Sequence, residues 1–113
     1  MNEQGVNIMN WIMLILAGGF EVAWAVALKY SNGFRNPPAA ALCVVSMILS
    51  MWFLSVAIRT IPMGTAYAVW TGIGAVGSVV AGIVLFGEPA VALRLLSVAL
   101  IVVGIVGLKL TAN

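Results

Sequence analysis

The sequence predicts an all-α membrane protein with four transmembrane helices in each protomer. Of the 113 residues, 64% are hydrophobic and 7% are charged, whereas soluble domains are about half apolar and about a quarter charged. So few polar side chains cannot cover the surface of a water-soluble particle. The charged residues also stand apart and leave four long apolar runs between them. We therefore expect one membrane domain over residues 11–113, preceded by an extension over residues 1–10.

The first apolar run covers residues 12–28 and is interrupted only by Glu21. Turn-forming residues follow it at positions 31–33, so we expect a helix over residues 11–30. A cleaved signal peptide is disfavoured, because no Lys or Arg precedes the run and Glu3 is acidic.

Three further helices are expected from the remaining runs. Pro38 can start a helix but cannot continue one, and the charge-free run behind it predicts a helix over residues 38–58. The third charge-free run leaves room for a Pro–Gly turn before a helix over residues 64–86. The last run is short for a bilayer, so we extend it to residues 90–110 and expect Arg94 to reach the interface.

The composition excludes several classes of function. With no His and one Cys, the chain has no ordinary zinc or haem ligand set, so we expect no metal site. The five basic residues are scattered, so nucleic acid is not an expected partner. The connections between the runs are too short to hold a soluble active site. We therefore expect no enzyme, and any chemistry must lie among helices inside the lipid bilayer.

The basic residues do not select one orientation in the membrane. Arg59 and Lys109 fall on the side of the N-terminus, whereas Lys29, Arg35 and Arg94 fall on the opposite side. With so small a difference, the positive-inside rule favours neither orientation. The same chain could therefore insert both ways and form an antiparallel homodimer. The alternative is a fixed orientation set by details that this count misses.

Glu21 is the one acidic residue inside a predicted span, near its middle. A carboxylate at the bilayer centre costs roughly 2.5 to 3.5 kcal/mol on insertion scales, so it should face the bundle interior and be protonated or paired with a cation. Lys29 is the candidate partner on the same helix, but eight positions correspond to about 12 Å along the axis. An ion pair within one helix is therefore excluded, and Glu21 is a candidate functional residue.

Side chains of the first two helices can surround this carboxylate. Gly18 and Trp24 lie three positions before and after Glu21, which places a gap and an indole N–H donor on its face. Ser46 and Ser50 share a face of the second helix, where each hydroxyl can bond a backbone carbonyl or a partner across helices.

The third and fourth helices carry further candidates. Tyr67 and Trp70 share one face, although an interfacial aromatic belt would also explain Tyr67. Gly72 and Gly74 predict a bend in the third helix, with simple helix packing as the alternative. The fourth helix has a small-residue packing face, formed by Ser97, Gly104 and Gly107.

Three motifs combine these residues: Gly18-x-x-Glu21-x-x-Trp24-Ala25, Leu28-Lys29-Tyr30-Ser31-x-Gly33-Phe34 and Pro62-x-Gly64-Thr65-Ala66-Tyr67-Ala68-Val69-Trp70-Thr71-Gly72-Ile73-Gly74. Together they resemble the small multidrug resistance family, and the resemblance extends from Met9 to about Leu110. Within that family, Trp24 and the stretch from Gly64 to Tyr67 resemble the guanidinium-exporter subtype. The quaternary-ammonium exporters usually carry a small residue at the position of Trp24.

The resemblance implies a four-helix protomer, an antiparallel dual-topology homodimer and proton-coupled export across the bacterial inner membrane. It implies that Glu21 of both chains binds protons or substrate, with protons as the coupling ion and no other cofactor, and that the fourth helices form the dimer contact. The residues that it places around Glu21 are Trp24, Ser50, Tyr67 and Trp70. Guanidinium, with N–H donors around a planar rim, suits paired carboxylates, whereas a tetraalkylammonium ion needs an aromatic cage.

Three other functions stay open. A multidrug exporter of quaternary ammonium or polyaromatic cations is the nearest alternative. A proton-conducting rotor subunit is also small and built around a membrane carboxylate, but it would be a two-helix hairpin. A purely structural membrane subunit would leave Glu21 unexplained.

Overall fold

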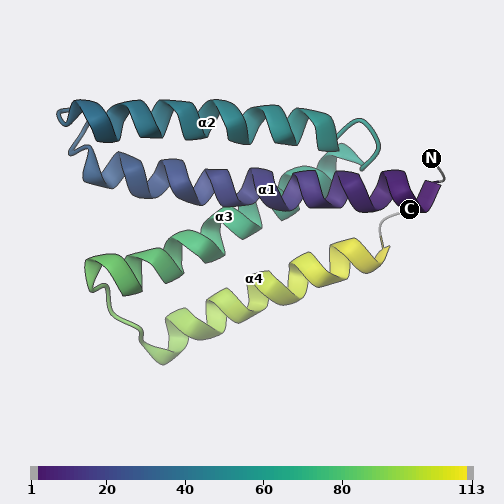
Figure 1. Ribbon diagram of the computed structural model, residues 1–113. Coiled ribbons are helices and arrows are strands. Elements are labelled where there is room, and N and C mark those ends of the chain that lie inside the picture. Colours follow the sequence, from purple (N-terminus) through teal and green to yellow (C-terminus); the bar gives the residue numbers. More distant parts are fainter. Residues whose placement is uncertain (1–2, 112–113) are drawn as a thin grey trace.

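The computed structural model describes residues 3–111, with side chains from residue 8 onward, and this part of the chain folds into four helices (Figure 1). Their bounds are α1 Glu3–Tyr30, α2 Pro37–Ala57, α3 Met63–Phe86 and α4 Ala92–Thr111. Each is long and apolar enough to cross a membrane. Even α4, with 20 residues, is about 30 Å long, which matches the hydrocarbon core of a bilayer.

Two helix starts differ from the sequence-based expectation. Helix α1 begins at Glu3, so residues 3–10 continue the helix instead of forming a separate extension. No proline interrupts these residues, and the apolar span itself begins at Ile8. Residues 1–2 of the expected extension lie outside the described part. Helix α4 begins at Ala92, two residues later than expected.

The connection from α1 to α2 is a tight turn organised by Ser31. Its buried hydroxyl donates to the carbonyl of Leu28 at 2.6 Å and accepts from the N–H of Phe34 at 3.0 Å. The backbone of Asn32, Gly33 and Phe34 has positive φ, a conformation that glycine and asparagine adopt at low cost. The turn reverses the chain, so α2 runs back along α1.

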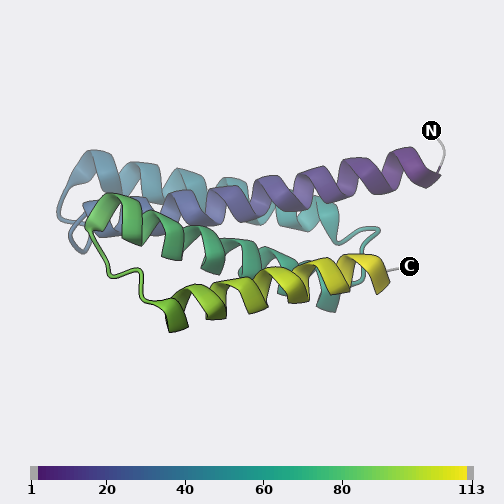
Figure 2. The same cartoon turned by 90° about the horizontal axis from the view of Figure 1, so that it is seen from below.

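Helix α1 is the centre of the bundle. Helix α2 packs antiparallel along it, and α3 crosses it at an angle (Figure 1, Figure 2). Helix α4 lies along α3, and within the described residues its backbone approaches no other helix. The start of α1, the α2–α3 connection and the end of α4 lie at one end of the molecule, and the other two connections lie at the opposite end (Figure 1).

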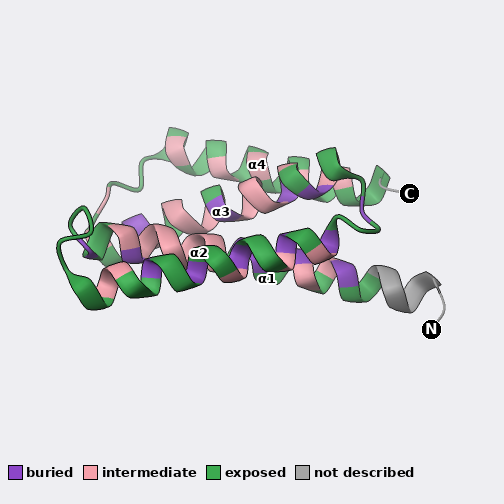
Figure 3. Ribbon diagram, turned by 90° about the horizontal axis from the view of Figure 1, so that it is seen from above, coloured by how far each residue is buried: buried purple, intermediate pink, exposed green. Residues whose placement is uncertain are grey.

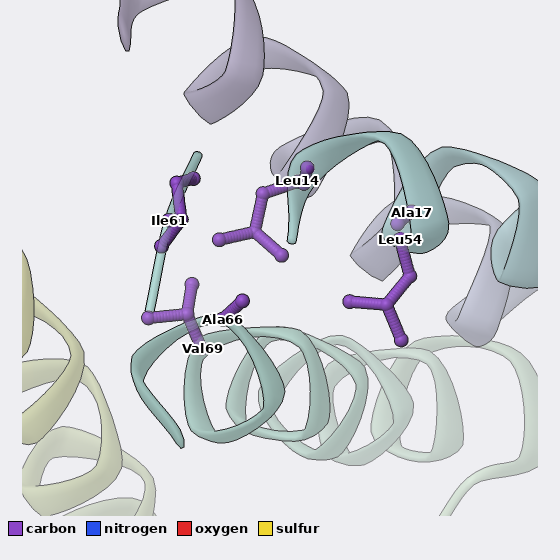
Figure 4. Close-up of a cluster of buried hydrophobic side chains, with 7 residues drawn as sticks. Leu14, Ala17, Leu54, Ile61, Ala66 and Val69 are labelled. Carbon is purple, nitrogen blue, oxygen red and sulfur yellow. The ribbon is translucent and has the colours of Figure 1, made fainter. Parts of the chain in front are cut away.

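The core is a small cluster where α1, α2 and α3 meet (Figure 4). Its members are the buried apolar residues Leu14, Ala17, Leu54, Ala57, Ile61, Ala66 and Val69. Helix α4 contributes no buried residue over its described length, and Figure 3 shows it in the colours of intermediate and exposed residues. The chain therefore holds α1, α2 and α3 together and leaves α4 at its edge.

Candidate functional site

Glu21 lies near the middle of the apolar span Ile8–Tyr30 of α1 and packs directly against Gly74 in α3. A Cβ atom added at Gly74 would overlap the carboxylate, whose Cδ lies 2.5 Å from that position. One turn further along, a Cβ at Gly77 would likewise collide with the side chain of Val22. Helix α3 therefore approaches α1 closely because glycine lines the contact, and that approach encloses the carboxylate.

One oxygen of this carboxylate has no hydrogen-bond partner. Among the described residues, Glu21 Oε2 is the buried side-chain nitrogen or oxygen atom that lacks a partner. A buried polar atom without a partner is costly, and an ionised one more so. The arrangement favours a ligand that neutralises the charge and fills the bonding position, which a proton or a cationic N–H donor can do.

A hydroxyl of α2 joins the three helices next to Glu21. Ser50 Oγ donates to the carbonyl of Ala17 in α1 at 2.6 Å and accepts from Trp70 Nε1 in α3 at 2.9 Å. Ser50 is fully buried. It bonds across helices rather than to the carbonyl four residues earlier, which was the alternative open to it. A hydroxyl has one donor and two acceptor positions, so these two bonds leave one acceptor position of Ser50 unused.

The hydroxyl and the carboxylate occupy neighbouring layers of the same site. Ala17 and Glu21 are four residues apart on α1, and Trp70 and Gly74 are four residues apart on α3. Each spacing is one helical turn, about 6 Å along the axis. The layer of Ser50 and Trp70 therefore lies one turn from the layer of Glu21 and Gly74.

Tyr67 extends this aromatic face toward the start of α3. Its ring lies 5.5 Å from the ring of Trp70, at an interplanar angle of 58°. The Tyr67 side chain is exposed in the protomer, whereas Trp70 is half-buried. The pair forms a tilted aromatic wall, with the indole held in place by the hydrogen bond to Ser50.

The structure places two of the expected site residues, Trp24 and Gly18, differently, and gives Gly72 the packing contact that was its alternative. Within the described residues, no hydrogen bond joins the indole of Trp24 to Glu21. The spacing of the two residues places them on one helix face, but the side-chain rotamer decides where the indole N–H points. Gly18 makes no gap beside the carboxylate, because Ile73 of α3 fills that position with Cγ2 2.5 Å from a built Cβ. Gly72 faces Ile105 of α4 and lets these two helices approach. The bend expected at Gly72 and Gly74 stays a prediction.

The small residues of α4 face away from the rest of the protomer. Gly104 and Gly107 are exposed, and a Cβ at either would meet no atom within 4 Å. Ser97 is also exposed, and its hydroxyl donates to the carbonyl of Leu93 at 2.9 Å within the same helix. Within the described residues, this small-residue face therefore packs against no other helix of the chain.

Sequence reasoning missed two features of the site. It did not assign the glycine contact with Glu21 to Gly74, and it did not connect Ser50 with Trp70. The residues themselves were all recognised as candidates, but the register between α1, α2 and α3 that pairs them is not encoded in the spacing along any one helix.

Comparison with known proteins gives one family. The family model described as "Small Multidrug Resistance protein" matches residues 9–101. The chain is 54% identical over 105 residues to the guanidinium exporter of Salmonella typhimurium strain LT2, covering 93% of this chain and all of that protein. It is 55% identical to the guanidinium exporter of Escherichia coli K12 and 54% identical to that of Citrobacter freundii, with the same coverage.

Proposed function

The chain belongs to the small multidrug resistance family, and from this premise we propose that it exports guanidinium in exchange for protons. It is a multi-pass protein of the bacterial inner membrane, with four membrane-spanning helices. The proposed substrate follows the names of relatives that match over nearly the whole chain. Proton coupling and the role of Glu21 are proposals that depend on the chemistry of the site.

The observation that carries the proposal is the unpartnered oxygen of Glu21 in the middle of a membrane span. A lone carboxylate there is stable only when a proton or a cation neutralises it. The two ligands compete for the same oxygen atoms. If the site can turn from one side of the membrane to the other only when this charge is neutralised, each turn carries either protons or the cation. An inward proton gradient then drives the cation outward.

We propose that the working unit is an antiparallel homodimer with two Glu21 side chains in one site. The nearly balanced Lys and Arg count supports insertion in both orientations. The unused face of Ser97, Gly104 and Gly107 supports a contact between α4 helices, since small residues let two helices approach closely in lipid. Two nearby carboxylates also match two of the three N–H edges of a planar guanidinium ion.

The hydroxyl of Ser50 supports guanidinium over a quaternary ammonium ion. Its proton is committed to Ala17 and one lone pair to Trp70, so it can only accept a further hydrogen bond. Guanidinium offers N–H donors to this lone pair and to the carboxylates. Tetramethylammonium offers none, so its entry would leave these buried acceptors unpaired, and such mismatches discriminate strongly.

The test is the electrical current of the purified protein in reconstituted membranes. The two Glu21 side chains of the proposed dimer together exchange two protons for one guanidinium ion, so each cycle moves one net charge. We therefore expect a current on addition of guanidinium that reverses with the imposed proton gradient, and a much smaller current with tetramethylammonium. Tetramethylammonium currents equal to or larger than those of guanidinium would replace this proposal with the multidrug exporter. A proton current that needs no cation would favour the proton-conducting subunit.

A further inference from the structure

A cluster of three charged residues joins three parts of the chain at one end of the bundle. Glu88, in the α3–α4 connection, accepts a hydrogen bond from Arg94 Nη2 at 2.8 Å through Oε1. Its other oxygen, Oε2, lies 3.4 Å from Lys29 Nζ in the last turn of α1. The same ammonium group lies 4.6 Å from the ring centre of Phe86, the last residue of α3. One carboxylate therefore bridges the end of α1 and the first turn of α4.

The backbone is shaped to hold this carboxylate in place. Helix α3 ends at Phe86 and is capped by Gly87, which has a φ of 66°, and the N–H of Glu88 then donates to the carbonyl of Gly82 at 3.1 Å. The Glu88 side chain folds back over Gly82, where a built Cβ would lie 2.7 Å from its Cδ. Glycine at position 82 therefore leaves the space that the carboxylate occupies. A side chain in that space would displace Glu88 from both cations.

This bridge supplies a connection that helix packing does not. Helix α4 packs along α3, and the described backbones of α4 and α1 do not meet. Between the ends of α1 and α3 there is also a cavity of about 160 Å³, lined by Ala25, Ser78 and Lys29 among others. At this end of the bundle the bridge through Glu88 joins the end of α1 to α4, whereas at the opposite end Lys109 Nζ of α4 lies 5.0 Å from the ring centre of Trp11 in α1.

We propose that Glu88 is a positioning residue for transport: its carboxylate clamps the first turn of α4 to the last turn of α1, so that both helices move as one unit. Helix α1 carries Glu21, two turns or about 12 Å from Lys29 along the axis. The clamp thus connects the helix that holds the ligand to the helix with the unused packing face. The inference rests on the proposed function, because the motion that it organises is that of a carrier.

The clamp stays closed at neutral pH. The hydrogen bond from Arg94, and after it the interaction with Lys29, lower the pKa of Glu88 below its ordinary value of 4.5. The charged groups that face Glu88 are Lys29 from α1 and Arg94 from α4, while the last turn of α3 brings none. Glu88 therefore stays ionised at neutral pH and does not switch with the protons that drive transport.

The first test is a distance measurement that needs no substrate. Spin labels are attached to cysteines at Asn36, whose side chain makes no cap hydrogen bond, and at Leu93 in the exposed first turn of α4. The background carries Cys43→Ala, and labelled protein is diluted with unlabelled protein in liposomes. We expect a narrow distance distribution that broadens in Glu88→Gln and stays narrow in the control Arg35→Gln, at the same end of the molecule. An unchanged distribution in Glu88→Gln would overturn the inference.

The second test separates positioning from ligand binding. In Glu88→Gln we expect the maximal guanidinium exchange rate to fall by about threefold or more, while the KM changes by less than about twofold. Adding Arg94→Gln to Glu88→Gln should lower the maximal exchange rate little further, since both changes break the same bridge. A changed KM with an unchanged maximal rate in Glu88→Gln would contradict the clamp. So would rate losses of Glu88→Gln and Arg94→Gln that add fully in the double variant. If Glu88→Gln does not fold, Arg94→Gln alone provides the same two readouts, and a normal distance distribution and rate would then overturn the inference.

The two tests also separate this inference from the proposed function. If the unchanged protein exchanges no guanidinium, the proposed function fails, but the distance measurement still decides whether Glu88 holds α1 and α4 together. If the unchanged protein transports and Glu88→Gln matches it in rate and in distance distribution, only the clamp fails.

Discussion

Trp70 Nε1 donates a hydrogen bond of 2.9 Å to Ser50 Oγ, and this bond is a polar connection between α3 and α2 inside the bundle. The two helices share little backbone contact, since both pack mainly against α1. Because the same hydroxyl donates to Ala17, Ser50 fixes the indole relative to α1. The aromatic wall next to Glu21 is therefore positioned by one serine.

Ser50→Ala should weaken or abolish guanidinium transport while leaving the fold intact. Interhelical hydrogen bonds in membranes contribute about 0.6 kcal/mol on average, so the loss in stability is small. The effect on guanidinium transport is larger than the effect on stability, because Trp70 becomes free to turn and a ligand N–H loses its acceptor. The measurement is guanidinium-driven current in reconstituted membranes. Ser46→Ala, also a buried serine of α2, is the matched control and should have a smaller effect, seen mainly in the tolerance for substituted guanidines. Equal effects of the two changes would contradict this role of Ser50.

Gly74→Ala should lower guanidinium transport by about tenfold or more, equivalent to at least about 1.4 kcal/mol. The added methyl group would occupy the position of the Glu21 carboxylate, so either the carboxylate or α3 must move. Gly64→Ala is the control, since a Cβ there meets no atom within 4 Å. We expect the control to transport normally. Normal transport by Gly74→Ala would show that the close contact with Glu21 is not needed.

The chain should insert in both orientations in about equal amounts. A cysteine placed at Thr111, in a Cys43→Ala background, is labelled in intact cells with a reagent that does not cross the membrane. About half of the molecules should react from outside and the rest only after the membrane is opened. Labelling of all molecules from one side would contradict the antiparallel homodimer.

The stabilising effect of Glu88 should disappear only in acid. Its pKa in the folded protein is lowered, chiefly by the hydrogen bond from Arg94, so its contribution is fully present above the ordinary value of 4.5. It is lost as the pH falls below that value and through the lowered pKa. The measurement is the thermal unfolding of the unchanged protein and of Glu88→Gln as a function of pH. The difference between them should be constant from about pH 5 to about pH 8 and shrink at lower pH. A difference that changes near neutral pH would contradict this assignment.

Much of this structure follows from hydropathy alone. The residues that interrupt the apolar runs, such as Lys29 and Arg59, lie at helix ends, and lipid leaves the intervening backbone no alternative to helix. The importance of Glu21 also follows from the sequence, because an acid in a span has a known energetic cost. These inferences need no knowledge of how the helices pack.

The contacts between helices could not be predicted in the same way. Glycines at positions 18, 72, 74 and 77 look equivalent in the sequence, yet only the register of α3 against α1 brings Gly74 to the carboxylate. The bridge from Lys29 to Glu88 joins residues 59 positions apart, and each alone looks like an ordinary interfacial charge. Trp24 shares a helical face with Glu21, but its rotamer decides whether its N–H reaches the carboxylate.

Proton release from the purified protein shows whether Glu21 binds protons and guanidinium in turn. In weakly buffered detergent solution at a pH where Glu21 is protonated, addition of guanidinium should release protons into the medium, and tetramethylammonium should release far fewer. Glu21→Gln, which can neither release a proton nor pair with a cation, should release none and should carry no current in reconstituted membranes. Guanidinium binding without proton release, or proton release that persists in Glu21→Gln, would contradict the account.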